Sequence, residues 1–207
     1  MTADCLLKLI TETNMQFAGF RPVRMANGSM ALPGVEYQVI ANSKTITEGD
    51  AIVIGGAAGA DVMDAVNEVV GGYAVGFFVD YGGKNLPLKQ ASTNSAYVDG
   101  TFTPATTGDT YVAAADNATD KKVAVAYIPA EDVVCSARED ATPATTTGSS
   151  TPGYYVDILT SDATYLDEST ASTTAANFLL VAGRSGDSAL DPTDSSRVMC
   201  RANELEI

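Results

Sequence analysis

Histidine and tryptophan are both absent from the 207 residues of this chain. Without histidine, the chain has no Ser–His–Asp or Cys–His nucleophile and no imidazole ligand for zinc. The most common general base at neutral pH is also missing. We therefore expect no enzyme, no catalytic residue and no cofactor, although catalysis by carboxylates, lysine or tyrosine stays open.

Basic residues are scarce, with 12 Lys plus Arg against 26 Asp plus Glu and a net charge of −14. No run of the sequence gathers the cations that a phosphate backbone requires. We therefore expect no direct contact with nucleic acid or with an anionic membrane. Strong acidity does supply solubility and repulsion between like copies, which matters where many copies share one surface.

Cysteine is limited to Cys5, Cys135 and Cys200, which are widely spaced and form no CxxC pair. An odd, sparse set does not indicate a disulfide-stapled secreted scaffold or a metal site. We interpret the three as reduced thiols that pack as small hydrophobic side chains in a cytosolic assembly environment.

Long apolar runs are also missing. No window approaches eighteen consecutive apolar residues, so no transmembrane helix is expected. The first ten residues include Asp4 and Lys8 and do not fit the pattern of a signal peptide.

Thr, Ala, Val, Ser, Gly and Asp recur throughout, a composition that favours strands and turns over helices. Roughly nine short strands are separated by turn signals, as in an antiparallel barrel or sandwich. We predict an all-β fold, an antiparallel β-barrel or β-sandwich with long loops. Residues 1–30 are expected to form an extended N-terminal arm, with a short helix at 3–15, before a single β-rich domain at 31–207.

The segment FAGFRPVR at 17–24 anchors this arm. Proline at 22 fixes its own φ and disfavours the helical region for Arg21, so the segment should run extended. An extended chain sends Phe20 and Pro22 to one side and Arg21 and Val23 to the other. The pattern is typical of an arm that docks on a partner. The alternative is that Phe17 and Phe20 begin the protein's own core and the arginines are solvated.

The glycine-rich segment 55–61 follows the apolar strand 51–54 and raises the possibility of a dinucleotide-binding unit. A helix at 61–70, a strand at 73–79 and Asp80 would complete it. Three features oppose this reading: Ile54 stands at the first glycine position, the helix would carry four valines, and no later βα units follow. A glycine-rich turn between antiparallel strands is the alternative.

Acidic residues cluster in two places without the spacing of an EF-hand loop, so solvated surfaces are expected and no metal. The members are Asp157, Asp162, Asp167, Glu168, Asp187, Asp191 and Asp194. No carboxylate pair is marked out for glycoside hydrolysis, and no G-x-S-x-G segment occurs.

Four short motifs resemble those of the capsid cement, or decoration, proteins of tailed bacteriophages. They are GFRPV at 19–23, GDAIV at 49–53, AVGF at 74–77 and RANEL at 201–205. The order and coarse spacing hold from about 17 to 207. The chain departs from the family in about sixteen residues before the arm, in long loops at 84–110 and 141–152, and in Glu204, where a histidine often stands.

The resemblance implies a virion protein that binds the outer surface of the expanded head, as a homotrimer at threefold positions, and ties neighbouring major capsid subunits together. Its contacts would come from the arm and the closing strand, with Arg21 or Arg24 pairing a capsid carboxylate. The candidate contact residues are Phe17, Phe20, Arg21, Pro22, Arg24, Arg201 and Asn203. Two rivals stay open: another virion β protein, such as a tail-tube or head-completion subunit, and a dinucleotide-binding module on 52–80.

Overall fold

The computed structural model describes the chain as a body of β-strands. The residues that it describes are 19–55, 58–66, 68–81, 84–88, 100–105, 108–120, 123–140, 152–173, 177–182 and 197–203. In these ranges the chain forms fifteen strands and one short helix, α3 (Asn117–Asp120). The predicted all-β class is confirmed. The expected helix at 3–15 and Phe17 lie outside the described residues.

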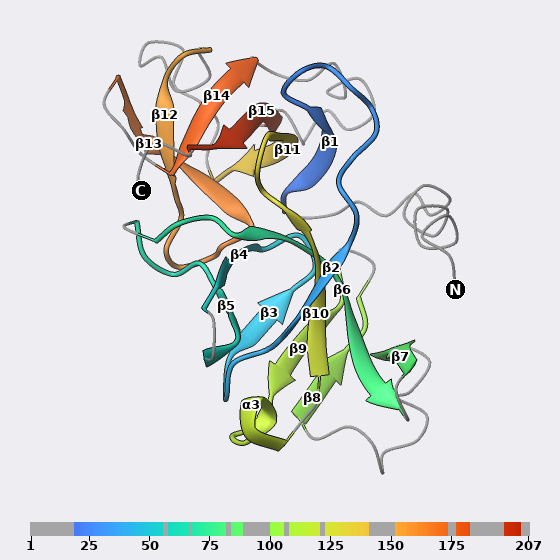
Figure 1. The fold of residues 1–207 in the computed structure, drawn as a ribbon. Helices are drawn as coiled ribbons and strands as arrows, with labels where there is room; N and C mark the ends of the chain where they lie inside the picture. Colours follow the sequence, from blue (N-terminus) through green and yellow to red (C-terminus); the bar gives the residue numbers. More distant parts are fainter. Residues whose placement is uncertain are drawn as a thin grey trace.

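Five strands close into a barrel in the upper part of Figure 1. They are β11 (Val133–Glu139), β12 (Tyr155–Ile158), β13 (Tyr165–Ser172), β14 (Phe178–Ala182) and β15 (Arg197–Ala202). The ring runs β11-β13-β12-β14-β15 and closes where β15 pairs with β11. Every pairing in it is antiparallel except that of β11 with β13. β1 (Arg21–Met25) adds to the edge of β11 outside the ring.

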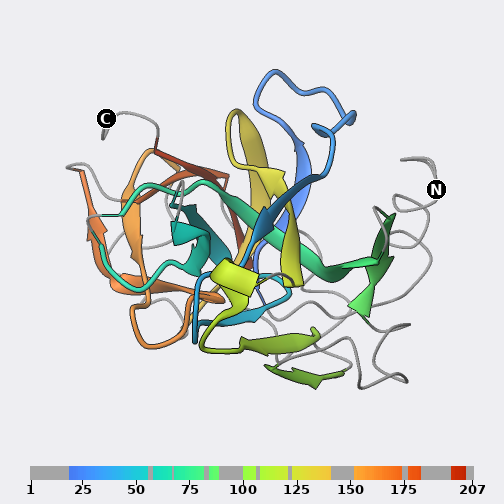
Figure 2. The same ribbon diagram turned by 60° about the horizontal axis from the view of Figure 1, so that its bottom comes forward.

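A second sheet lies beside the barrel and has the order β2-β10-β6-β4-β5, with β7 also paired to β6. Its strands are β2 (Glu36–Val39), β4 (Ala51–Ile54), β5 (Ala60–Val62), β6 (Gly72–Tyr81), β7 (Lys84–Pro87) and β10 (Val123–Pro129). A bridge between Ile40 and Ala60 brings the two ends of this sheet together. A small third sheet, seen in the foreground of Figure 2, contains β3 (Thr45–Thr47), β8 (Gly100–Thr103) and β9 (Thr110–Ala113).

Strands β4, β6 and β10 form a wall between two hydrophobic cores. Along β4, Ala51 faces the core of the barrel and Ile52 faces the core of the second sheet. Along β6, Tyr73 faces the core of the barrel and Ala74 faces the core of the second sheet. A strand buried on both faces needs apolar residues at every position, which explains the unbroken apolar runs in these segments. The two cores are therefore parts of one packed unit.

The closed barrel is one of the two architectures expected from the sequence. The described residues form more strands than the roughly nine expected, and β3, β5, β7 and β13 are among those not anticipated. β13 reads YLDESTAS, and only its inward side chain Leu166 is fully buried in the barrel core. Mixed polar sequence of this kind gives a weak strand signal because its period-2 pattern rests on few apolar residues.

The glycine-rich segment after β4 is a hairpin turn, and this corrects the dinucleotide-binding alternative. β4 pairs antiparallel with β5, and the Gly55 nitrogen donates to the Gly59 oxygen at 3.1 Å. β4 and β6 are antiparallel as well. A dinucleotide-binding unit requires parallel strands joined by a crossover helix. β5 occupies the start of segment 61–70, which the dinucleotide-binding alternative would require as a helix. The βαβ unit of that alternative is therefore not formed.

The turn at Gly49 joins the start of β1 to both cores. The Phe20 nitrogen donates to the Gly49 oxygen at 2.7 Å, and the Gly49 nitrogen donates to the Ala74 oxygen at 2.9 Å. Gly49 adopts a φ of 96°, a conformation that favours glycine. Gly19 lies so close that a β-carbon there would overlap the Gly49 carbonyl. Residues 19–25 therefore belong to the body of the domain rather than to a separate arm.

Carboxyl groups on both sides of Gly49 are buried and accept backbone hydrogen bonds. Glu48 Oε2 accepts from the Asp109 nitrogen at 3.0 Å, and Asp50 Oδ2 accepts from the Thr47 nitrogen at 2.7 Å. Burial, with a smaller contribution from the charge of Asp162, raises the pKa of Asp50 to about 7. The junction therefore contains an acid that titrates near neutral pH.

Replacement of Gly19 by alanine should destabilise the fold by at least about 3 kcal/mol, because the new β-carbon meets backbone that cannot move without disturbing both cores. Gly34→Ala is the matched control, since a β-carbon at Gly34 meets nothing within 4 Å. Urea unfolding midpoints of the two variants test this expectation. Equal effects of the two substitutions would contradict it.

Asp50→Asn should remove a pH dependence of stability. A folded-state pKa raised from 3.8 to about 7 means that the native protein holds a proton that the unfolded chain has released. This contribution is fully present below the unfolded pKa and is lost as pH rises through the folded value. Wild type should therefore lose up to about 4 kcal/mol relative to Asp50→Asn between about pH 4 and pH 8. If the difference in unfolding free energy between wild type and Asp50→Asn stays constant across that range, the raised pKa of Asp50 is refuted.

Candidate functional site: an arginine face on the barrel

Five of the six Lys and Arg side chains that the structure describes lie on three adjacent strands, two of the barrel and β1 at its edge. We call this surface the arginine face, and it consists of Arg21 and Arg24 on β1, Arg138 on β11, and Arg197 and Arg201 on β15. The sixth cation, Lys44, lies elsewhere and pairs with Asp61 at 2.5 Å and Asp64 at 3.7 Å. Among the side chains that the structure describes, most of the positive charge thus lies on one side.

Strand register explains why these arginines share a side. Val133, Cys135 and Ala137 of β11 point into the barrel core, so the residues between them point outward. Directly paired residues of neighbouring strands project to the same face. Val134, which points away from the barrel core but is only 1% exposed, is the partner of Arg24 on one edge of β11 and of Arg201 on the other. Arg138 pairs with Arg197 in the same way.

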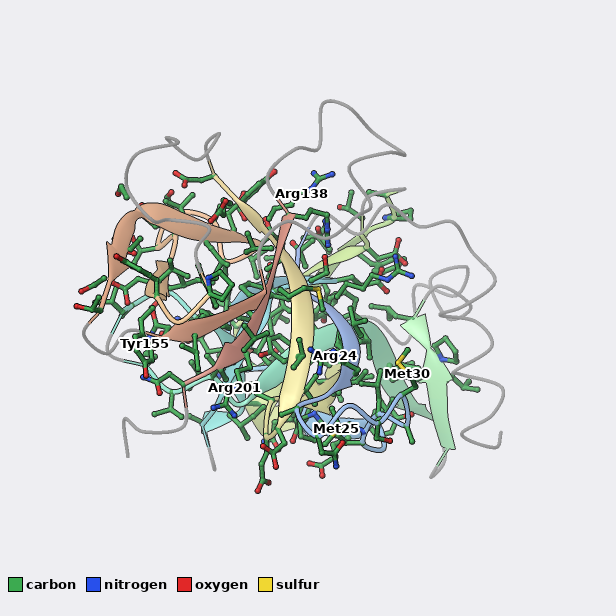
Figure 3. All side chains as sticks on the ribbon, turned by 90° about the horizontal axis from the view of Figure 1, so that it is seen from above. Arg24, Met25, Met30, Arg138, Tyr155 and Arg201 are labelled. Atoms are coloured by element: carbon green, nitrogen blue, oxygen red, sulfur yellow. The ribbon has the colours of Figure 1, made fainter. Side chains whose placement is uncertain are left out.

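The register continues as a row across the outside of the barrel. Arg201 pairs with Leu179 on β14, and Leu179 pairs with Tyr155 on β12. Figure 3 shows Tyr155, Arg201 and Arg24 in this order, with β11 between the two arginines and Met30 beyond Arg24. Met30 is 72% exposed, the highest value among the large apolar side chains that the structure describes. The row therefore combines guanidinium groups with apolar surface, a composition found at interface hot spots.

Arg197 lies across the arginine face and fixes the start of β1. Its Nε donates to Ser136 Oγ at 3.0 Å, and its Nη2 donates to the Gly19 oxygen at 3.1 Å and to the Ser136 oxygen at 3.3 Å. The planar guanidinium supplies several donors in a fixed geometry, which an ammonium group does not. Arg197 therefore has a positioning role, and it connects β15 to β1 over the intervening strand β11.

Arg21, Arg24 and Arg201 are suited to an anionic partner. β1, β11 and β15 carry no acidic residue at an outward position, since Glu139 is 2% exposed and follows the outward Arg138. Arg21 is exposed, and Arg24 Nη1 donates to the neighbouring Met25 oxygen at 3.2 Å. Among the described residues, no carboxylate lies within ion-pair distance of Arg21, Arg24 or Arg201. Guanidinium groups of this kind bind carboxylates through paired hydrogen bonds.

The structure brings together three of the residues that the sequence marked as candidate contacts. Arg21 and Arg24 lie on one side of β11 and Arg201 on the other, although about 180 positions separate them in the sequence. The expected alternation also holds at the start of β1, where Phe20 is buried and Arg21 is exposed.

The other candidate contacts have different places. Phe20 is 2% exposed and stacks between Tyr73 and Phe178, with ring centroids 5.6 and 4.7 Å away. Its side chain belongs to the protein's own core, the alternative that the sequence left open, and it is not available to a partner. Pro22 is half-buried opposite Cys135. Asn203 is half-buried, and its nitrogen donates to the Asn177 oxygen at 2.8 Å.

Two members of the arginine face, Arg138 and Arg197, were not anticipated. In the sequence each is an isolated cation near the end of an apolar strand, and only the pairing of β11 with β15 places them together. The premise that cations do not cluster holds along the sequence but not in space. The alternating pattern RVMCR at 197–201 was the available signal, because it puts both arginines on one face of a strand.

Carboxylates of the 157–168 cluster serve local backbone within the described part of the chain. Asp162 Oδ1 accepts from the Thr164 nitrogen at 3.1 Å and from its hydroxyl at 2.6 Å. Asp167 Oδ1 accepts from the Ser169 nitrogen at 3.1 Å. In the ranges described, no three potential ligand side chains are grouped to hold a metal ion. Nor does any helix in those ranges have the length and apolar character needed to span a membrane.

No protein-family model, curated protein or solved structure matches this chain. The site is therefore interpreted from its own geometry.

Arg197→Lys should destabilise the fold by about 1–3 kcal/mol, because the lysine cannot reproduce the hydrogen bonds to Ser136 and Gly19. Arg21→Lys, an exposed position on the same face, should change stability by less than about 0.5 kcal/mol. Chemical denaturation of both variants compares them at constant charge. If the Arg197→Lys protein is as stable as the Arg21→Lys protein, the positioning role of Arg197 is ruled out.

Proposed function

We propose that this chain is a structural protein of a tailed-bacteriophage virion, a capsid cement protein that binds the outer surface of the expanded head. In this proposal the arginine face docks on carboxylate-rich surface of the major capsid protein and ties neighbouring subunits together. The observation that carries the proposal is the gathering of five arginines on one side of a chain whose net charge is −14.

Electrostatics supports this orientation. A positive face on a chain whose net charge is −14 attracts an acidic partner at that face. Repulsion between the acidic surfaces keeps free copies apart. Once many copies bind a symmetric shell, modest contacts at each site combine into strong overall attachment. A homotrimer at threefold positions is the assembly that we propose.

The placement of the four motifs supports the resemblance to cement proteins. GFRPV at 19–23 supplies Phe20, whose nitrogen donates to Gly49 of GDAIV at 49–53, and the Gly49 nitrogen donates to Ala74 of AVGF at 74–77. RANEL at 201–205 begins with Arg201, which lies across β11 from Arg24. Segments far apart in the sequence thus meet at one junction and one face.

Arg24→Gln and Arg201→Gln should each weaken binding to expanded capsids that lack this protein by about tenfold or more, because a carboxylate on the shell loses its guanidinium partner. Lys44→Gln makes the same charge change away from the arginine face and should leave the affinity within about twofold. Co-sedimentation of capsids with each variant measures the dissociation constant, and circular dichroism verifies the fold.

The same assay at increasing salt separates this proposal from its rivals. Wild-type affinity should fall as ionic strength rises, since exposed charges are screened. Face variants that bind as tightly as wild type would overturn the role of the arginine face. Rings or tubes of the purified protein, with no binding to shells, would instead favour a tail-tube or head-completion subunit.

A further inference from the structure

Two cysteines lie opposite each other inside the barrel. Cys135 on β11 and Cys200 on β15 are direct register partners, and both are fully buried and present as free thiols. Both belong to the barrel core. The sequence, in which they are 65 positions apart, gave no indication that they meet.

The register pairing brings the two α-carbons into the range that a disulfide spans. Directly opposed residues in antiparallel strands have α-carbons about 4.5–5.5 Å apart. Disulfides join α-carbons about 4.4–6.8 Å apart when the side chains share a face. Cys135 and Cys200 share the inward face of the barrel, so their sulfur atoms can meet without a shift of strand register.

The position of the pair gives such a bond a structural consequence. β11 is the first strand of the barrel along the chain and β15 is the last, and their pairing closes the ring. A covalent link between them would hold the closing seam and all five strands in one loop of chain. Cross-links that close long loops restrict the unfolded chain most strongly.

We propose that Cys135 and Cys200 form a disulfide that locks the closing seam of the barrel when the protein meets a disulfide oxidant such as oxidised glutathione. A thiolate of one cysteine attacks the oxidant, one glutathione leaves, and a mixed disulfide forms. The second cysteine then displaces the other glutathione. Two protein thiols are oxidised to one disulfide, and one oxidised glutathione is reduced to two molecules of glutathione.

The surroundings of the pair determine when it reacts. Burial raises the pKa of both thiols, so the closed barrel contains few thiolates. The Tyr73 hydroxyl beside Cys135 is fully buried too. Oxidation therefore proceeds when the β11–β15 seam opens or before it first closes during folding. Once formed, the bond is shielded from reductants by the same burial.

The test uses the full chain with Cys5→Ser, which leaves the two barrel thiols. The protein is incubated with oxidised glutathione in a series of urea concentrations below the unfolding midpoint, then alkylated and mapped by mass spectrometry. We expect a cross-linked peptide pair containing Cys135 and Cys200, formed faster as urea rises. The cross-linked protein should melt roughly 5–15 °C higher than the same protein that was never oxidised.

Cys5→Ser combined with Cys200→Ser, or with Cys135→Ser, leaves one barrel thiol and is the matched control. These variants should take up one glutathione in urea and show no rise in melting temperature. The proposal is overturned if the two-thiol protein gains two glutathiones, or stays reduced even when refolded in the oxidant. A cross-link that leaves the melting temperature unchanged would also overturn it.

Discussion

The close approach of Gly19 and Gly49 is the constraint on which the rest of the structure depends. At this point the chain that becomes β1 hydrogen-bonds to the turn before β4, and the same turn hydrogen-bonds to β6. Phe20 enters the barrel core immediately afterwards and stacks on Tyr73 of β6 and Phe178 of β14. Because no side chain separates the two backbones, β1 starts in a fixed place, and its arginines are directed outward beside β11.

The wall shared by the two cores shows what the sequence predicts well. The apolar run at 51–54 predicted a strand, and the structure confirms it as β4, one of the three strands of the wall. Closure of the barrel was not predictable beyond the choice of barrel or sandwich, because it depends on the pairing of β11 with β15 across many intervening residues. β13 was not predicted because polar residues dominate its sequence. β5 was not predicted because its apolar residues also fit a helix.

The candidate site, like the fold, could be predicted from the sequence only in part. The extended course of the chain after Phe20 and the outward direction of Arg21 follow from proline geometry and strand alternation. The burial of Phe20 required knowledge of its neighbours, since a phenylalanine beside a glycine is equally suited to a core and to a docking arm. Long-range register decides which arginines become neighbours, and sequence spacing does not encode it. Charge scattered along the chain thus becomes a face only after folding.

Electron cryomicroscopy of expanded tailed-phage capsids that lack a cement protein, mixed with the purified protein, is the most direct test of the proposed function. The account predicts density for the protein on the outside of the shell at threefold positions, with β1, β11 and β15 against the major capsid protein and acidic capsid side chains opposite Arg24 and Arg201. Bound protein whose arginine face points away from the shell, or shells that stay bare, would contradict it.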